Sequence, residues 1–235
     1  MVEPIRLLID NNGKEITSGN CCVCGEKWDL NEYKPQQKKQ IKRYLDGRPI
    51  DFKVTDINNI CYCKHCNNVT VFEYPFSDKC GVRDKYNDDE YKRILNSDEP
   101  IEIRRVKLAE YKFKNTKDDN FVLSILHLYW YYDSINDIEQ RNQYAQKLIN
   151  LYKRNVVYNI KVEPMCLLKI DGAKFNLNLE MILIDIYRRM GDFENAKELI
   201  NTGRNKLFIK DDSTIQMRLF QLQFDLCEKQ DINRY

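Results

Sequence analysis

The sequence contains little of what most enzymes need for catalysis. It has two histidines and eight glycines in 235 residues, and no glycine-rich phosphate loop, His-Glu-x-x-His or Gly-x-Ser-x-Gly motif occurs in it. The sequence therefore lacks the residues that define three common kinds of catalysis: phosphoryl transfer through a P-loop, hydrolysis by a zinc protease and acyl transfer by an α/β-hydrolase. Carboxylate pairs such as Asp88-Asp89 are most often solvated faces or helix caps in a chain that is 31% charged. We therefore expect a protein that is not an enzyme.

The sequence also lacks an excess of one charge and a long apolar run. Its 38 Lys and Arg against 36 Asp and Glu leave a net charge of +2, which creates no global attraction for nucleic acid or an anionic membrane. The longest apolar stretches, such as Phe121 to Tyr132, fall short of the roughly 20 residues that a bilayer requires. Residues 1–10 lack the basic start and apolar core of a secretory signal. We expect a soluble, cytoplasmic protein with no membrane partner.

The sequence contains an unusual cluster of cysteines, since seven of its nine cysteines lie in the first 80 residues. In a reducing compartment, clustered cysteines indicate metal ligands before disulfides. Cys21-Cys22-Val23-Cys24-Gly25 and Cys63-Lys64-His65-Cys66-Asn67 each hold two thiols separated by two residues, followed by a residue that accepts a left-handed backbone conformation. Two such knuckles complete the tetrahedral shell that Zn²⁺ prefers. The predicted ligands of one zinc ion per chain are Cys21, Cys24, Cys63 and Cys66.

The neighbouring residues leave alternatives open. A redox Cys-x-x-Cys site requires one pair beside a βαβ unit, a pattern that is missing here. Cys22 is displaced from the knuckle spacing, and the sequence leaves open whether Cys61, His65 or Cys80 replaces a ligand. The long insertion between the pairs, with a predicted helix from Gln36 to Leu45, is tolerable because loop-closure entropy grows only with the logarithm of length. Four protein ligands leave the ion no open position, so a structural metal is expected.

The pattern changes from strands to helices along the chain. Alternating residues and turns predict strands at Ile5–Ile9, Glu15–Thr17 and Val69–Tyr74. From about Tyr86 onward, apolar residues recur at helical spacing and predict the helices Ile101–Phe113, Phe121–Tyr132, Ile138–Arg154 and Thr214–Glu228. Large and small side chains alternate from Leu183 to Ile200 around the turn Met190-Gly191-Asp192, which is the spacing of a tetratricopeptide-type repeat.

The predicted fold class is therefore α+β and mostly α, with three parts. Residues 1–83 would form a split zinc-ribbon β module with an inserted helix, residues 84–118 a helical connector, and residues 119–235 tetratricopeptide-like helical hairpins.

The order of these motifs resembles a known family. A Cys-x-x-Cys-Gly knuckle, a long insertion, a second Cys-x-x-Cys and then helices containing the run Tyr187 to Phe193 are similar to a bacterial family known only as a domain of unknown function. That family joins an N-terminal split zinc ribbon to C-terminal tetratricopeptide-like helices, and the resemblance covers about residues 15–230. It departs where Cys22 and Lys64 replace proline and Asn67 replaces the second glycine. The resemblance implies a fold and zinc but no activity.

The repeat favours a protein-binding adaptor. The first helix of a tetratricopeptide unit would turn one row of residues toward a concave side, where paired arginines commonly hold a carboxylate. The alternative for the two arginines is that they only interact with the dipole at the helix end. The predicted partner-binding residues are Asn178, Met181, Asp185, Arg188 and Arg189.

The alternative function is binding of single-stranded nucleic acid, or a transcription-linked regulatory role. It rests on two basic segments, Lys34–Arg48 and Arg104–Lys117, and on aromatic residues near the predicted ribbon that could stack on bases. Such aromatics usually form a small core, and such helices usually present a solvated surface. The candidate nucleic-acid contacts are Lys38, Lys39, Lys42 and Arg43. The partner's identity and the oligomeric state are not encoded in these patterns.

Overall fold

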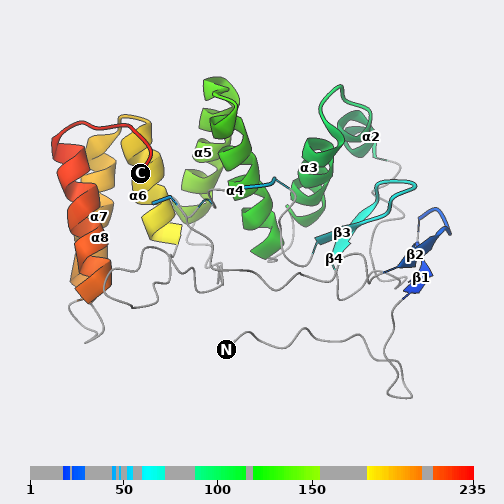
Figure 1. The fold of residues 1–235 in the computed structure, drawn as a ribbon, viewed down its shortest axis with the longest axis horizontal. Helices are drawn as coiled ribbons and strands as arrows, with labels where there is room; N and C mark the ends of the chain where they lie inside the picture. The colour runs from blue at the N-terminus through cyan, green and yellow to red at the C-terminus, as the bar shows by residue number, and fades with distance from the viewer. Residues whose placement is uncertain are drawn as a thin grey trace, which may run out of the picture. The chain divides into compact units, whose positions relative to one another are not determined.

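The computed structural model describes residues 18–21, 23–29, 44–45, 48, 52–54, 60–71, 88–114, 119–153, 179–207 and 214–235. This part of the chain is mostly helical, with seven helices and two small antiparallel sheets of two strands each (Figure 1). The chain divides into two compact units. Unit 1 comprises Met1–Gln37 and Val54–Leu128, and unit 2 comprises Lys38–Lys53 and Tyr129–Tyr235. The three-part division inferred from the sequence stays a prediction.

The two sheets of unit 1 are equivalent hairpins. Strand β1 (Ser18–Asn20) pairs with β2 (Lys27–Asp29), and β3 (Ile60–Tyr62) pairs with β4 (Val69–Val71). The innermost pairs are Asn20 with Lys27 and Tyr62 with Val69, so each hairpin encloses a tip of the same length. Each tip holds one of the two cysteine pairs.

Two helices pack against the second hairpin. Helix α2 (Asp89–Leu95) begins at Asp88, whose carboxylate accepts a hydrogen bond from the backbone N–H of Glu90 at 2.9 Å and so caps the helix. Helix α3 (Ile101–Phe113) follows Pro100. Apolar side chains from β4, α2 and α3 bury one another in a single cluster, Val69, Tyr91, Leu108, Ala109 and Phe113. The second hairpin therefore shares its core with α2 and α3.

Unit 2 contains the end of α4 (Asp119–Ser134), α5 (Ile138–Lys153), α6 (Leu179–Arg189), α7 (Phe193–Leu207) and α8 (Thr214–Glu228). Three of these helices end in the same way. After α4, α6 and α8, one residue takes positive φ: Asn136 at 58°, Gly191 at 78° and Gln230 at 52°. The N–H of the following aspartate then bonds the carbonyl five residues back, at 2.9 Å in all three cases. This is the Schellman motif, which ends a helix and reverses the chain.

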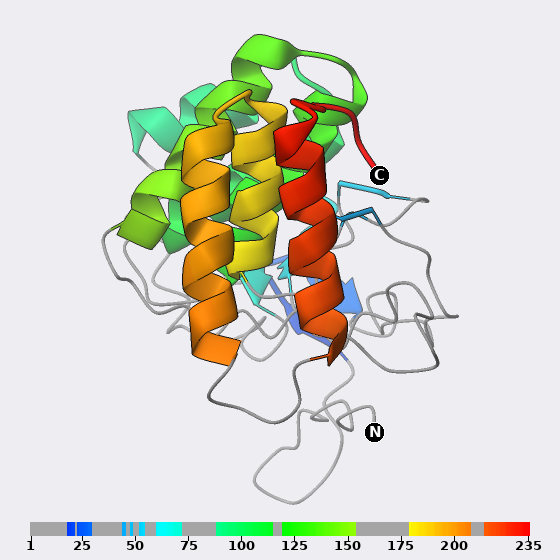
Figure 2. The same ribbon diagram turned by 90° about the vertical axis from the view of Figure 1, so that its left-hand side faces the viewer.

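Helices α6, α7 and α8 run side by side (Figure 2). Every residue of α6 from Met181 to Arg188 is buried. The close approach of α7 and α8 uses Gly203, because a Cβ atom placed there would lie 2.5 Å from the ring of Phe220. Helix α6 is thus an internal helix of unit 2, with contacts to α5, α7 and α8.

Several sequence predictions are confirmed. The helices Ile101–Phe113 and Thr214–Glu228 have the predicted bounds, and the turn at Gly191 joins α6 to α7. The predicted helix Gln36–Leu45, apart from Tyr44 and Leu45, lies outside the described residues, as do the strands Ile5–Ile9 and Glu15–Thr17. Among the described helices, none is long and apolar enough to cross a membrane.

Candidate metal centre

The two cysteine pairs have the same backbone geometry. In the first tip, the N–H of Cys21 donates to the carbonyl of Glu26 at 2.8 Å, and the N–H of Gly25 donates to the carbonyl of Cys21 at 2.9 Å. In the second tip, Cys63 bonds Asn68, and Asn67 bonds Cys63, both at 2.8 Å. The fifth residue of each motif takes positive φ, 77° at Gly25 and 56° at Asn67. This left-handed residue turns the chain so that both thiols of a pair face the same point.

The four sulfur atoms lie where one ion would bring them. All four Sγ atoms are within 4.8 Å of one another. The Sγ of Cys21 lies 3.7 Å from that of Cys66, and the Sγ of Cys24 lies 3.7 Å from that of Cys63, too far apart for disulfides. A tetrahedron with metal–sulfur bonds of about 2.3 Å has edges of about 3.8 Å. The four cysteines predicted as ligands therefore come together and could hold a metal ion.

Burial and local hydrogen bonds shift the pKa values of three of the four thiols. Burial raises the pKa of Cys66 far above its ordinary value and also raises the pKa of Cys24. Burial acts in the same direction on Cys21, but hydrogen bonds from the backbone N–H groups of Cys24 and Val23 outweigh it, so the pKa of Cys21 is lowered. A cation that binds here displaces protons, so its affinity falls as the pH falls.

The second knuckle is held in place by α3. The guanidinium of Arg105 donates two hydrogen bonds to the side-chain oxygen of Asn67, at 3.2 Å from Nε and 3.0 Å from Nη2. The same guanidinium lies 3.9 Å from the ring centroid of Tyr62, at the base of the hairpin. The ammonium of Lys112 donates to the carbonyl of Val69 on the other strand. Asn67 thus joins the second knuckle to α3.

Of the other candidate ligands, only His65 has a side chain among the described residues. His65 lies inside the second knuckle, is exposed, and is absent from the four-residue cluster. The side chains of Cys22, Cys61 and Cys80 lie outside the described residues. Asn68 is a contact that the sequence did not indicate: its buried side-chain amide points toward the sulfur of Cys21, 4.0 Å away. An amide donor facing a thiolate stabilises its charge.

The residues predicted to bind a partner lie elsewhere, in unit 2, and most of them are buried. The exposed fractions of Met181, Asp185 and Arg188 are 2%, 1% and 0%, and Asn178 lies outside the described residues. The expectation that these residues face an open concave side is therefore corrected. Their role in partner binding stays a prediction.

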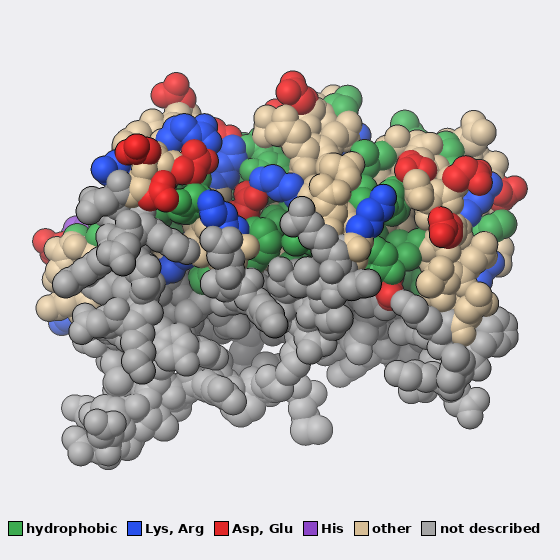
Figure 3. Space-filling view, turned by 180° about the vertical axis from the view of Figure 1, so that it is seen from behind, with side chains coloured by type: hydrophobic (Ala, Val, Ile, Leu, Met, Phe, Trp, Pro, Cys, Tyr) green, Lys and Arg blue, Asp and Glu red, His purple; other side chains and the backbone are tan. Residues whose placement is uncertain are grey.

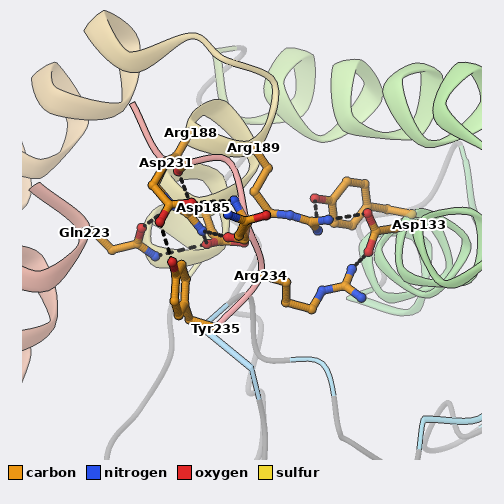
Figure 4. Close-up of polar contacts among 10 residues, drawn as sticks. Asp133, Asp185, Arg188, Arg189, Gln223, Asp231, Arg234 and Tyr235 are labelled. Atoms are coloured by element: carbon orange, nitrogen blue, oxygen red, sulfur yellow. Dashed lines mark hydrogen bonds and ion pairs between the residues drawn. The ribbon is translucent and has the colours of Figure 1, made fainter. Parts of the chain in front are cut away.

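Arg188 makes four hydrogen bonds inside the chain (Figure 4). It donates to the carboxylate of Asp185 at 2.7 Å and to the side-chain oxygen of Gln223 at 3.0 Å. Its other two acceptors are the backbone carbonyls of Asp231 and Asn233, the second at 2.8 Å. The buried guanidinium thus has acceptors on α6, on α8 and in the segment 231–235 that follows α8.

The basic segments that motivated the nucleic-acid alternative are described only in part. Lys38, Lys39, Lys42 and Arg43 lie outside the described residues. On α3, Arg104 donates to the carbonyl of Leu95, and Lys107 pairs with Glu99 at 2.7 Å. On the face shown in Figure 3, Lys and Arg side chains alternate with Asp and Glu. The basic residues of α3 described here thus serve contacts within unit 1.

Comparison of this chain with family models, with curated proteins and with solved structures gives no match. The resemblance to the bacterial family of zinc ribbons and helical repeats stays a prediction.

Proposed function

We propose that this protein is a zinc-stabilised adaptor of the cytoplasm that binds a protein or peptide partner through tetratricopeptide-like helical hairpins. Two equivalent hairpins with a cysteine knuckle at each tip have the construction of a zinc ribbon, and their sulfur–sulfur distances of 3.7 Å suit tetrahedral Zn²⁺. With four protein ligands, the ion would stabilise the fold and leave no position for a substrate.

The ends of the helices support the repeat assignment. Helices α4 and α6 each end at a residue of positive φ, and an aspartate follows directly in both cases. Asp137 accepts from the N–H of Gln140 at 3.1 Å before α5, and Asp192 accepts from the N–H of Asn195 at 3.3 Å before α7. The pairs α4–α5 and α6–α7 therefore use one connection, as copies of one helical hairpin would.

The observation that carries the binding proposal is the way unit 2 holds residues 231–235. A single guanidinium on α6 binds two backbone carbonyls of this segment, two residues apart. Backbone contacts of this kind recognise an extended peptide whatever its side chains, and neighbouring side chains then select the sequence. These contacts support a peptide-binding site in unit 2.

The binding proposal is tested by selecting short random peptides on the zinc-loaded full-length protein. We expect enriched peptides to be displaced by a synthetic peptide with the sequence of residues 229–235, because both would occupy the same surface. Single-stranded and duplex oligonucleotides serve as the comparison, titrated over a range of salt concentrations. Failure to enrich any peptide, together with salt-dependent oligonucleotide binding, would replace the adaptor with the nucleic-acid alternative.

The metal proposal has its own test. Protein purified without added zinc should contain one zinc and no stoichiometric iron per chain by elemental analysis. A Cys24→Ser variant should lose the metal, whereas Cys227→Ser, at a buried cysteine of α8 outside the cluster, should retain it.

A further inference from the structure

The segment after α8 is bound to the rest of unit 2 through three of its backbone carbonyls, those of Asp231, Asn233 and Tyr235. The chain reverses at Gln230, and Arg188 then binds the carbonyls of Asp231 and Asn233. At the far end, the N–H of Leu45 donates to the carbonyl of Tyr235 at 2.7 Å. This segment therefore occupies the surface that covers Arg188, and its removal would expose a buried charge.

The side chain of Arg234 meets an environment that already carries excess positive charge. It contacts the carboxylate of Asp133, which also pairs with Arg189 at 2.5 Å (Figure 4). Arg141 pairs with the same carboxylate at 3.6 Å. Asp133 is only 3% exposed, and the three arginine side chains are 15%, 10% and 14% exposed. Three guanidinium groups against one carboxylate leave a net charge of +2 among these four residues. Like charges this close and this shielded from water repel one another.

Two further observations favour an additional anion beside Arg189 and Arg141. The Nε–H of Arg189 is buried and has no hydrogen-bond acceptor among the described residues. Burial lowers the pKa of Arg141, and the neighbouring guanidinium of Arg189 lowers it further. A buried N–H of a charged group without an acceptor costs free energy, and a carboxylate is its strongest acceptor.

We propose that Asp133, Arg141, Arg188 and Arg189 form a peptide-binding surface whose resident occupant is the segment 231–235, and that its preferred occupant is an extended partner segment with Asp or Glu where Arg234 lies. With this carboxylate in place of Arg234, two carboxylates would face the two guanidinium groups of Arg141 and Arg189, and Arg189 would gain its missing acceptor. The protein's own segment is then a replaceable occupant, because its arginine adds to the repulsion. This inference rests on the proposed peptide-binding function and names the chemistry of the partner.

The first test is made within the full-length chain. Arg234→Glu is compared with Arg234→Gln, which removes the charge without adding the carboxylate. We expect Arg234→Glu to melt at a higher temperature than Arg234→Gln, because only the carboxylate pairs with Arg141 and Arg189. A lower or equal melting temperature for Arg234→Glu would overturn the charge argument.

The second test adds the occupant from outside. Fluorescently labelled peptides with the sequence of residues 229–235, carrying Arg, Gln or Glu at the position of Arg234, are titrated with the zinc-loaded full-length protein. We expect the Glu peptide to bind about tenfold more tightly than the Arg peptide, with the Gln peptide between them, and the difference to shrink at high salt. In an Arg189→Gln variant most of the preference should disappear. Lys147→Gln, at an exposed lysine of α5, is the matched control and should keep it.

The outcomes distinguish the preference for an acidic partner from the peptide-binding function on which it rests. If the peptides bind with equal affinity, or the Arg peptide binds most tightly, the preference for an acidic partner is wrong and the peptide-binding function stands. If no peptide binds while the helices remain folded by circular dichroism, the peptide-binding function is wrong and this inference falls with it.

Discussion

Substitution of Asn67 tests whether α3 stabilises the candidate metal centre, because the backbone and the side chain of Asn67 make separate contributions to stability. Its φ of 56° lies in the left-handed region, which glycine adopts freely, asparagine tolerates and alanine resists. Its side-chain oxygen accepts two hydrogen bonds from Arg105 of α3. Substitution by glycine removes only the second property, and substitution by alanine removes both.

The expected magnitudes follow from these two contributions. A hydrogen bond to a charged group contributes about 1.5–3 kcal/mol, and the partial exposure of Asn67 and Arg105 favours the lower end. Asn67→Gly recovers a few tenths of a kcal/mol in the backbone, so we expect a net loss of about 1 kcal/mol. Asn67→Ala adds about 1–2 kcal/mol of left-handed strain, for a loss of about 2–4 kcal/mol. The stability order is then parent, Asn67→Gly, Asn67→Ala.

The assay is urea unfolding of the zinc-loaded protein, followed by release of zinc to a chromogenic chelator. Arg105→Met serves as the second background of a double-mutant cycle. In that background Asn67→Gly should no longer destabilise, because the acceptor has lost its donor. If Asn67→Gly equals or exceeds the parent in stability when Arg105 is present, the anchoring of the knuckle by α3 contributes nothing and the reasoning fails.

The remaining predictions concern the rest of both units. Cys66→Ser should abolish zinc binding and increase the rate of amide hydrogen exchange in β3, β4, α2 and α3, which share one core. Helices α6–α8, which belong to unit 2, should keep their protection from exchange, and an equal increase in both units would contradict this prediction. Gly203→Ala should destabilise unit 2 by about 1–2 kcal/mol in thermal unfolding, because overlap of the new methyl group with the Phe220 ring outweighs the gain of about 1 kcal/mol in helix propensity. Phe220→Leu, which removes the ring, should reverse the loss. A hydrogen bond from the Tyr235 hydroxyl lowers the pKa of Asp231, so its contribution is complete above about pH 4 and is lost as the pH falls through the lowered value. The difference in urea midpoint between the parent and Tyr235→Phe should therefore shrink from pH 7 toward pH 3, and a constant difference would exclude this linkage.

Most local features of the described chain could be predicted from the sequence because their causes are local. Helix α3 begins after Pro100 and follows its apolar spacing, and the turn between α6 and α7 needs the positive φ that Gly191 supplies. The four clustered cysteines were predicted because the spacing of each knuckle is itself a local property. The distance between the knuckles along the chain carried no information about how they meet.

The burial of Asp185 and Arg188 could not be predicted because its causes are remote. Their spacing of three residues on one helix is compatible with an exposed pair, which is the usual place for such charges. Arg188 can be buried because Gln223 and the carbonyls of Asp231 and Asn233 accept hydrogen bonds from its guanidinium. These partners lie 35 to 45 residues further along the chain than Arg188. No periodicity within α6 encodes them.

The two arginines of α6 show how neighbouring residues of one type come to differ. Each nitrogen of the Arg188 guanidinium donates at least one hydrogen bond, to carbonyl oxygens or to the carboxylate of Asp185, so it holds the backbone of the segment 231–235 without excess charge. Arg189 shares Asp133 with two other arginines and keeps one buried N–H without an acceptor. A residue whose hydrogen bonds are complete fixes the position of a peptide, and a residue with unbalanced charge selects what the peptide carries. Replacement of Arg188 should therefore abolish binding of every peptide, whereas replacement of Arg189 should remove only the distinction between acidic and basic ones.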